Sequence, residues 1–221
     1  MSLPPPIREV KLCYVTDRKA LDGTTDEQIR LLLRKIGNAS RAGIDWIQIR
    51  EKDLPARALS ELVREAVRLV PASCRILVND RLDVAWTTGA SGVHLGEQSL
   101  PVGEVRQFLR DQNHGGEFLV GASTHSLEAA LDAEKAGAHY VIFGPVFATP
   151  SKVRFGEPQG LQRLAEVCAR ISIPTLAIGG ISLENVQVCI RAGAGGMAAI
   201  RLFQHAGDVQ VVASALRSRI H

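Results

Sequence analysis

Short apolar segments alternate with longer amphipathic segments along the whole sequence. The short segments are rich in β-branched residues, as buried strands are, whereas the longer ones repeat apolar residues at helical spacing. Predicted strands cover residues 10–16, 46–50, 75–79, 92–95, 118–121, 140–143, 174–178 and 196–200. Predicted helices cover residues 27–42, 57–70, 102–111, 127–136, 161–171, 183–192 and 209–220, with a short one at 82–88. The pattern therefore repeats a strand–helix unit throughout the chain.

Residues at the ends of the predicted helices support this interpretation. Ser126 stands directly before one helix, where a hydroxyl caps free backbone N–H groups. Gly43, Gly137 and Gly193 each follow a predicted helix, where glycine readily adopts the left-handed conformation that ends it.

Strands that alternate with helices run parallel, because each helix returns the chain to the same end of the sheet. Eight such units in 221 residues are typical of a TIM barrel. A doubly wound open sheet is the alternative, and it usually has fewer strands. We therefore predict the α/β class and a single-domain TIM (β/α)8 barrel. Its chemistry should lie just after the C-terminal ends of the strands.

Composition narrows the class of protein further. The chain is 46% hydrophobic and 22% charged, with a net charge of +3 and both signs mixed along the sequence. It has no apolar run near the ~20 residues of a membrane span, and no basic tail that would indicate a nucleic-acid partner. We therefore expect neither a membrane nor a nucleic-acid partner, and the sequence does not decide between a monomer and a homo-oligomer.

Cysteine usage and the start of the chain bear on where the protein works. The four cysteines form no CxxC pair and lie in apolar stretches, which favours a reduced, cytoplasmic protein. Residues 1–9 lack the features of a signal peptide and are expected to be a flexible leader. Residues 10–221 are then the barrel domain.

Polar residues gather where the second predicted strand ends. Gln48 and Arg50 alternate with apolar neighbours and so share a strand face, and Lys52 follows them. A barrel interior normally holds Val, Ile or Leu, so a buried ion pair is one interpretation of this pattern. A functional role is favoured, because a buried cation without a fixed partner is costly.

The next three strands also end in groups that carry chemistry. Asp80, after Asn79, suits either a magnesium ion or the cap of the following helix. His94 alternates with apolar residues and fits a layer of the barrel interior. Ser123 and His125 end the fifth strand, where they are either catalytic or simply terminate the strand.

Two later segments suit phosphate. The long loop after the sixth strand carries Thr149, Ser151 and Lys152, which suit a phosphate clamp or an irregular surface loop. Gly180 follows the seventh strand, where TIM barrels often hold phosphate with backbone N–H groups.

These motifs, in this order, resemble the thiamine phosphate synthase/TenI superfamily from about residue 11 to residue 220. The resembling segments are Gln48-Ile49-Arg50-Glu51-Lys52, Val78-Asn79-Asp80, Gly92-Val93-His94-Leu95-Gly96, Ser123-Thr124-His125, Gly144-Pro145-Val146-Phe147 with Thr149, Ser151 and Lys152, and Ala177-Ile178-Gly179-Gly180-Ile181. The superfamily fold is a TIM barrel, which agrees with the pattern of strands and helices.

The resemblance implies an enzyme that joins a pyrimidine pyrophosphate to a thiazole phosphate, giving thiamine phosphate and pyrophosphate. Its partners are then small phosphorylated substrates, and its cofactor is Mg²⁺. The implied site comprises Arg50, Lys52, Ser123, His125 and Lys152 for catalysis, Gln48, Asn79, Thr149, Ser151, Gly180, Ile200 and Arg201 for substrate binding, and Asp80 for the metal.

Two positions depart from the synthase pattern. Ser99 stands where synthases carry a second magnesium-ligating Asp, and Ile200-Arg201 stands where Ile-Ser is usual. Both departures resemble the TenI branch, which implies a thiazole tautomerase that uses a histidine at the position of His125. The synthase is favoured by the presence of the residues that the resemblance assigns to the activated pyrimidine, its pyrophosphate and the metal, namely Gln48, Arg50, Lys52, Asn79 and Asp80. A non-catalytic binder of thiamine phosphate is the third alternative.

Overall fold

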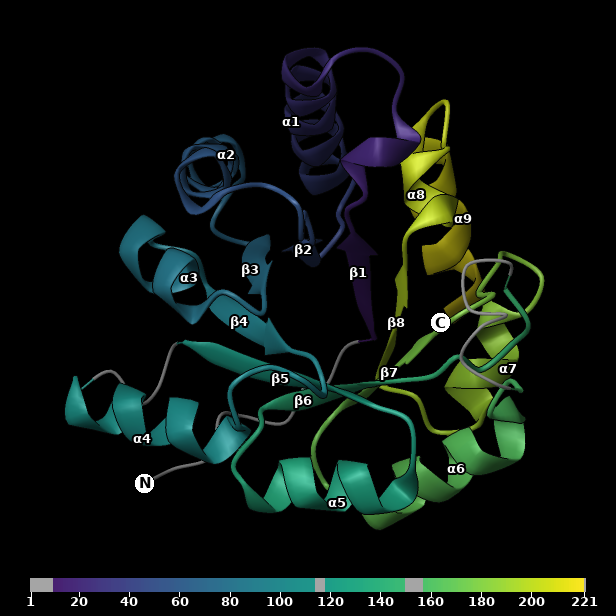
Figure 1. The fold of residues 1–221 in the computed structure, drawn as a ribbon. Helices are drawn as coiled ribbons and strands as arrows, with labels where there is room; N and C mark the ends of the chain where they lie inside the picture. The colour runs from purple at the N-terminus through teal and green to yellow at the C-terminus, as the bar shows by residue number, and fades with distance from the viewer. Residues whose placement is uncertain (1–9, 114–117, 150–156, 221) are drawn as a thin grey trace.

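Eight parallel strands form a closed barrel in this computed structural model, which describes residues 10–113, 118–149 and 157–220 (Figure 1). The strands are β1 Lys11–Val15, β2 Trp46–Ile49, β3 Arg75–Asn79, β4 Gly92–Leu95, β5 Leu119–Thr124, β6 Tyr140–Phe143, β7 Thr175–Ile178 and β8 Gly196–Ala199. The helices are η1 Arg18–Ala20, α1 Thr25–Arg41, α2 Ala56–Leu69, α3 Leu82–Thr88, α4 Val102–Asp111, α5 Leu127–Lys135, α6 Gly160–Arg170, α7 Val186–Arg191, α8 Arg201–Gln204 and α9 Val209–Ile220.

The last strand closes the sheet onto the first. β8 pairs with β1 in parallel over a register that aligns Leu12 with Met197, and Lys11 N donates to Gly195 O at 3.0 Å. An open doubly wound sheet would leave these two strands as edges. The predicted single-domain TIM barrel is therefore confirmed, and the helices surround the strands in Figure 1. The expected leader, residues 1–9, lies outside the described residues.

The barrel interior is filled by the inward positions of each strand. Residues two apart on a strand share a face. The buried inner cluster comprises Cys13, Val15, Trp46, Leu77, Tyr140, Ile142, Leu176 and Ala198. Tyr140 crosses the interior, and its ring lies 4.7 Å from that of Trp46. This packed centre leaves the polar positions nearer the C-terminal strand ends to form the mouth.

The predicted helix ends are confirmed in detail. Ser126 Oγ accepts a hydrogen bond from Ala129 N, so it caps α5. Gly43, Gly137 and Gly193 have φ values of 82°, 93° and 99°, the left-handed backbone that ends a helix after its last turn.

Two boundaries differ from the prediction in a way that matters for the site. β5 continues to Thr124 instead of ending at 121, so Ser123 lies within a strand and two positions beyond Gly121 on its inner face. α7 begins at Val186 instead of 183, because Asn185 holds the preceding turn through bonds to Ser182 N and Gly180 O. The sequence pattern also did not predict η1 and α8, which are too short to show helical periodicity.

Two further findings concern the class of protein. All four cysteines are free thiols, and Cys13, Cys74 and Cys189 are buried. Burial raises the pKa of the Cys189 thiol to about 11, so this group behaves as a small apolar residue. Within the described ranges, no helix is long and apolar enough to cross a membrane.

The absence of a side chain at Gly121 makes room for the Tyr140 ring. A Cβ atom at this position would lie 2.0 Å from Tyr140 Cζ. Gly121→Ala should therefore destabilise the protein by roughly 1–3 kcal/mol, because the buried ring has to shift. Chemical denaturation measures the loss. Gly103→Ala is the control, since a Cβ there meets nothing within 4 Å and should leave stability unchanged or raised. Equal stability of the two variants would contradict this packing.

Candidate active site

The predicted polar residues of β2 and β3 meet at the C-terminal mouth of the barrel. Gln48 is 3% exposed, and its Nε2 donates to Asn79 Oδ1 at 2.8 Å. Asn79 Nδ2 in turn donates to Asp80 Oδ2 at 2.6 Å. Gln48 Oε1 is buried and has no hydrogen-bond partner among the described residues. A buried acceptor without a partner is costly unless a ligand supplies a donor.

Asp80 is the charged centre of this group. Its φ of 62° places it in the left-handed region, which is uncommon for a residue with a side chain. Its carboxylate accepts from Gly96 N at 3.1 Å and from Ser99 Oγ, and lies 3.2 Å from Lys52 Nζ. Burial raises the pKa of Asp80, but these donors and the ammonium together lower it, so the carboxylate is ionised at neutral pH.

Asp80 does not cap the following helix. The N-cap residue of α3 is Arg81, which makes no side-chain capping bond. The capping interpretation of Asp80 is therefore wrong, and its carboxylate is directed instead to Ser99 and Lys52. The left-handed backbone of Asp80 is also strained, and such strain is typical of functional positions.

The same carboxylate bears on the implied magnesium ion. Each oxygen of Asp80 already accepts from two donors, and no group of three His, Cys, Asp or Glu side chains in the described ranges suits a metal. Mg²⁺ is commonly bound through one or two carboxylates together with substrate phosphates. The residues therefore fit a magnesium ion that enters with a phosphate-bearing ligand, and do not form a complete site by themselves.

The segment that carries Arg50 and Lys52 is fixed by Glu51, which lies between them. Glu51 is buried, and its carboxylate accepts from Thr16 Oγ1 at 2.6 Å and from Arg18 Nη1 at 3.0 Å. Thr16 Oγ1 also accepts from Arg50 N at 3.0 Å. The chain after β2 is thus tied to the chain after β1 through buried groups, which fixes the backbone that presents the two cations.

Arg18 also binds Asp53, the residue that follows Lys52. Its guanidinium donates to both carboxylate oxygens of Asp53, at 2.6 and 2.7 Å. The Arg18–Glu51 pair is buried, so removing Glu51 would leave an uncompensated buried charge, which is strongly destabilising. Arg50 itself has no ion-pair partner in the described part of the chain, so its charge is available at the mouth.

His94 lies inside the barrel, as its alternation with apolar residues predicts. It is 1% exposed, and its Nε2 lies 2.9 Å from Ser123 Oγ while its Nδ1 lies 3.1 Å from Tyr140 Oη. Burial lowers the pKa of His94 to about 4; nearby Asp80 raises it and Arg50 lowers it further. Ser123 is therefore held by a neutral imidazole, and it is not merely the end of a strand.

His125 occupies a different environment, on the rim. Its Nδ1 is hydrogen bonded to the carbonyl oxygen of Gly144, and its Nε2 lies 3.8 Å from Glu97 Oε1. Both side chains are substantially exposed. Because a carbonyl only accepts, the proton of a neutral His125 lies on Nδ1, and Nε2 presents a lone pair at the rim.

The loops after β6 and β7 pack closely together. Gly180 has a φ of 66°, and a Cβ atom there would lie 2.7 Å from both Phe147 Cβ and Ala148 O. Glycine is therefore required by backbone conformation and by the close approach of the two loops. This contact brings the predicted phosphate-binding turn beside the loop that carries Thr149.

Arg201 and Thr149 are also joined. Arg201 Nη2 donates to Thr149 Oγ1, and Arg201 begins the short helix α8, directly after Ile200. Two of the predicted phosphate ligands, Ser151 and Lys152, lie outside the described residues. The structure thus brings together one rim of the predicted phosphate site.

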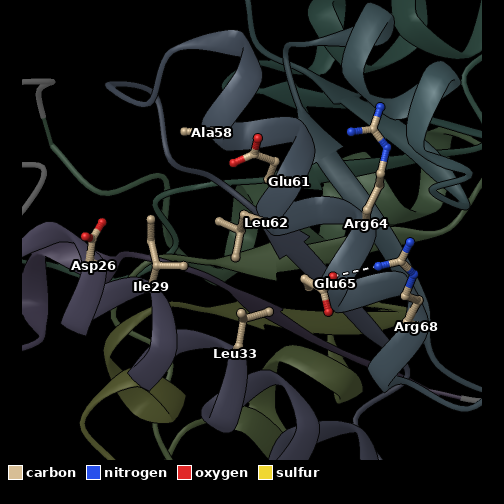
Figure 2. Close-up of a pocket in the computed structure, with 9 residues that line it drawn as sticks. All are labelled: Asp26, Ile29, Leu33, Ala58, Glu61, Leu62, Arg64, Glu65 and Arg68. Carbon is tan, nitrogen blue, oxygen red and sulfur yellow. Dashed lines mark hydrogen bonds and ion pairs between the residues drawn. The ribbon is translucent and has the colours of Figure 1, made fainter.

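A separate hollow of about 460 Å³ lies between α1 and α2 on the outside of the barrel (Figure 2). Its charged side chains are exposed, and Arg68 pairs with Glu65 at 2.6 Å. No strand end contributes to this hollow, so the chemistry remains with the mouth.

Reasoning from the sequence did not assign roles to Thr16, Arg18, Glu51 or Tyr140. Glu51 stands within the motif that carries Arg50 and Lys52, but its partners come from another strand–helix unit more than 30 residues earlier. Its position between Arg50 and Lys52, two residues before Asp53, is the only local signal that Glu51 is buried and fixes this segment.

Comparisons with known proteins identify the family of the chain. A family model described as thiamine monophosphate synthase matches residues 12–203. The chain is 43% identical to thiamine-phosphate synthase of Methanoculleus marisnigri, covering 95% of this chain and 94% of that protein. It is 37% identical to thiamine-phosphate synthase of Syntrophomonas wolfei, covering 95% of each chain.

Solved structures give the same result. Thiamine phosphate pyrophosphorylase from Pyrococcus furiosus superposes with a TM-score of 0.82 at 30% identity, over 97% of this chain and 96% of that chain. A 3-hexulose-6-phosphate synthase, with a TM-score of 0.70 at 18% identity, shares the fold. Both the family model and relatives above 30% identity cover most of the sequence. The chain therefore belongs to the thiamine monophosphate synthase family.

Proposed function

We propose that the chain is a thiamine phosphate synthase, a transferase of thiamine biosynthesis. It joins 4-amino-2-methyl-5-hydroxymethylpyrimidine pyrophosphate to thiazole phosphate and releases pyrophosphate. The observation that carries this proposal is the mouth itself. There Lys52 lies 3.2 Å from Asp80, and the partly buried Gln48–Asn79 pair lies beside them. A tautomerase has no pyrophosphate to hold, so the presence of this cluster favours the synthase.

The reaction breaks one bond and forms one. The C–O bond between the pyrimidine methylene and the pyrophosphate breaks, and its electron pair leaves with the pyrophosphate. The thiazole nitrogen then donates its lone pair to the pyrimidine carbocation. Arg50 and Lys52 stabilise negative charge as it develops on the leaving group, which is where fixed cations contribute most to rate.

Other residues hold the substrates and the metal in this proposal. Asp80 would hold Mg²⁺, which would neutralise charge on the pyrophosphate oxygens. Gln48 and Asn79 would bind the activated pyrimidine, and Ser123 would lie near it. The thiazole phosphate would be bound by Gly180, Thr149, Ser151, Lys152, Ile200 and Arg201. We also place the protein in the cytoplasm, because its cysteines are free thiols.

His125 supports a second candidate function, tautomerisation of the thiazole phosphate. Its Nδ1 is bonded to a carbonyl, and its Nε2 faces Glu97 on an exposed rim. A histidine with one nitrogen fixed by a carbonyl and the other facing an open rim has the arrangement used in general acid–base catalysis. Ser99, bonded to Asp80 where synthases carry a carboxylate, also fits this alternative.

The first test is an assay with both substrates and Mg²⁺, following thiamine phosphate and pyrophosphate. The protein should form both products in equal amounts. Lys52→Ala should reduce turnover by roughly 100-fold or more, the loss seen when a preorganised charge-stabilising group is removed. Its melting temperature should stay near that of the wild type, because Lys52 is mostly exposed. Lys135→Ala, on the outer helix α5, is the matched control and should retain full turnover. Normal turnover of Lys52→Ala would contradict the role of Lys52.

Magnesium should bind weakly without pyrophosphate, since Asp80 is the one carboxylate that the described residues give this cluster and its oxygens already accept from other donors. Calorimetric titration of the free protein should show little binding, and inorganic pyrophosphate should increase it. Asp80→Asn should remove that increase. Tight stoichiometric binding to the protein alone would overturn this view and would point to another carboxylate at the mouth.

His125→Ala separates the two candidate functions. In a synthase no histidine base is required at the carbocation stage, so turnover should fall less than about tenfold. A tautomerase should lose the 10²–10⁴-fold that general acid–base catalysis typically supplies. Both reactions are measured with the wild type and the variant. The synthase function would be refuted if the wild type tautomerised thiazole phosphate but did not couple the pyrimidine, and if His125→Ala lost the tautomerase activity.

A further inference from the structure

Three side chains from adjacent strands form one hydrogen-bonded chain through the barrel interior. Tyr140 on β6 lies at its inner end, His94 on β4 in the middle, and Ser123 on β5 at the mouth. The Oη–Nδ1 distance is 3.1 Å and the Nε2–Oγ distance is 2.9 Å. The rings of His94 and Tyr140 stack at 5.6 Å, which fixes the orientation of the imidazole.

The buried phenol decides the direction of these bonds. Tyr140 is 0% exposed, and His94 Nδ1 is the hydrogen-bond partner of its hydroxyl within the described residues. A buried O–H without an acceptor is costly. The hydroxyl hydrogen therefore points to Nδ1, which has to present a lone pair.

The state of His94 follows from this lone pair. A neutral imidazole carries one N–H, and an imidazolium carries two. Because Nδ1 accepts from Tyr140, the single proton lies on Nε2, which donates to Ser123 Oγ. The other tautomer and the imidazolium would both leave the phenol hydrogen without an acceptor.

We propose that Tyr140 and His94 act as positioning residues that make Ser123 a hydrogen-bond donor to the substrate. Ser123 Oγ accepts from His94, so its own hydrogen is free to point into the mouth. The hydroxyl then recognises an acceptor atom of the pyrimidine pyrophosphate, either a ring nitrogen or a phosphate oxygen, and disfavours a donor at that place. This specificity rests on the proposed synthase function, but the tautomer of His94 does not.

The packing around the chain supports this arrangement. Gly121 aligns with both His94 and Tyr140 in the sheet register, and a Cβ atom there would lie 2.4 Å from Tyr140 Oη. The glycine thus leaves the space that the hydroxyl occupies. Tyr140 contributes its ring to the core and its hydroxyl to the site, a combination that phenylalanine would not supply.

The direct test is ¹⁵N NMR of histidine-labelled protein at pH 7, with the His94 signals assigned by their loss in His94→Gln. We expect the Nε2–H tautomer in the wild type. Observation of the Nδ1–H tautomer or of the imidazolium would overturn the proposal. Because this measurement needs no substrate, an inactive protein with the Nε2–H tautomer would reject the synthase function and leave the hydrogen-bond direction intact.

Kinetics test whether the chain acts on the reaction. Tyr140→Phe removes the donor to Nδ1 and should lower kcat/KM about fivefold, the typical worth of one hydrogen bond. In a Ser123→Ala background the same change should have no further effect. Equal losses in both backgrounds would show that Tyr140 acts only through the core and would overturn the proposal.

Tyr14→Phe is the matched control. Tyr14 is also buried, and its hydroxyl is bonded to Gln204 Oε1, beside Phe203 outside the barrel interior. We expect a loss of stability similar to that of Tyr140→Phe, with unchanged kcat/KM and an unchanged His94 tautomer. A control variant that changed the kinetics as much as Tyr140→Phe would count against the proposal.

Discussion

Closure of a parallel sheet is the constraint on which the rest of this structure depends. Every strand of such a sheet ends at the same edge, and the pairing of β8 with β1 turns that edge into a ring. Residues as distant in sequence as Gln48, Ser123 and Gly180 therefore belong to one mouth. The helices that return the chain also place a loop after each strand, so each unit can contribute a side chain to the ring.

Closure of the barrel also removes polar groups near the mouth from water, so these groups need hydrogen-bond or ion-pair partners. Neighbouring strand–helix units supply these partners to one another. Glu51 is satisfied by Thr16 and Arg18 from the preceding unit, while the Lys52 ammonium reaches Asp80 on the next one. A buried ion pair is weak evidence for added stability. Its clear consequence here is geometric, since it fixes the segment that carries the cations.

Hydrophobic periodicity was sufficient to predict the fold, because each unit is a regular strand and an amphipathic helix. It failed where contacts with distant parts of the chain determine the structure of a segment. The residues of β5 beyond Gly121 are Ala122, Ser123 and Thr124, which are small and end in two hydroxyls like a turn, yet pairing with β6 keeps them in the sheet. The buried partners of Glu51 come from another strand–helix unit, so no local pattern predicts them. Ser151 and Lys152 stay predictions, since they lie outside the described residues.

The central proposal is that the mouth holds the pyrophosphate end of the substrate and that Asp80 is the carboxylate that holds the metal there. A crystal structure with inorganic pyrophosphate and Mg²⁺ tests it most directly. We expect the pyrophosphate against Arg50 and Lys52, with the ion bridging it to Asp80 and with Lys52 moved from the carboxylate to the phosphate. Pyrophosphate bound elsewhere, or a metal held without Asp80, would contradict the account.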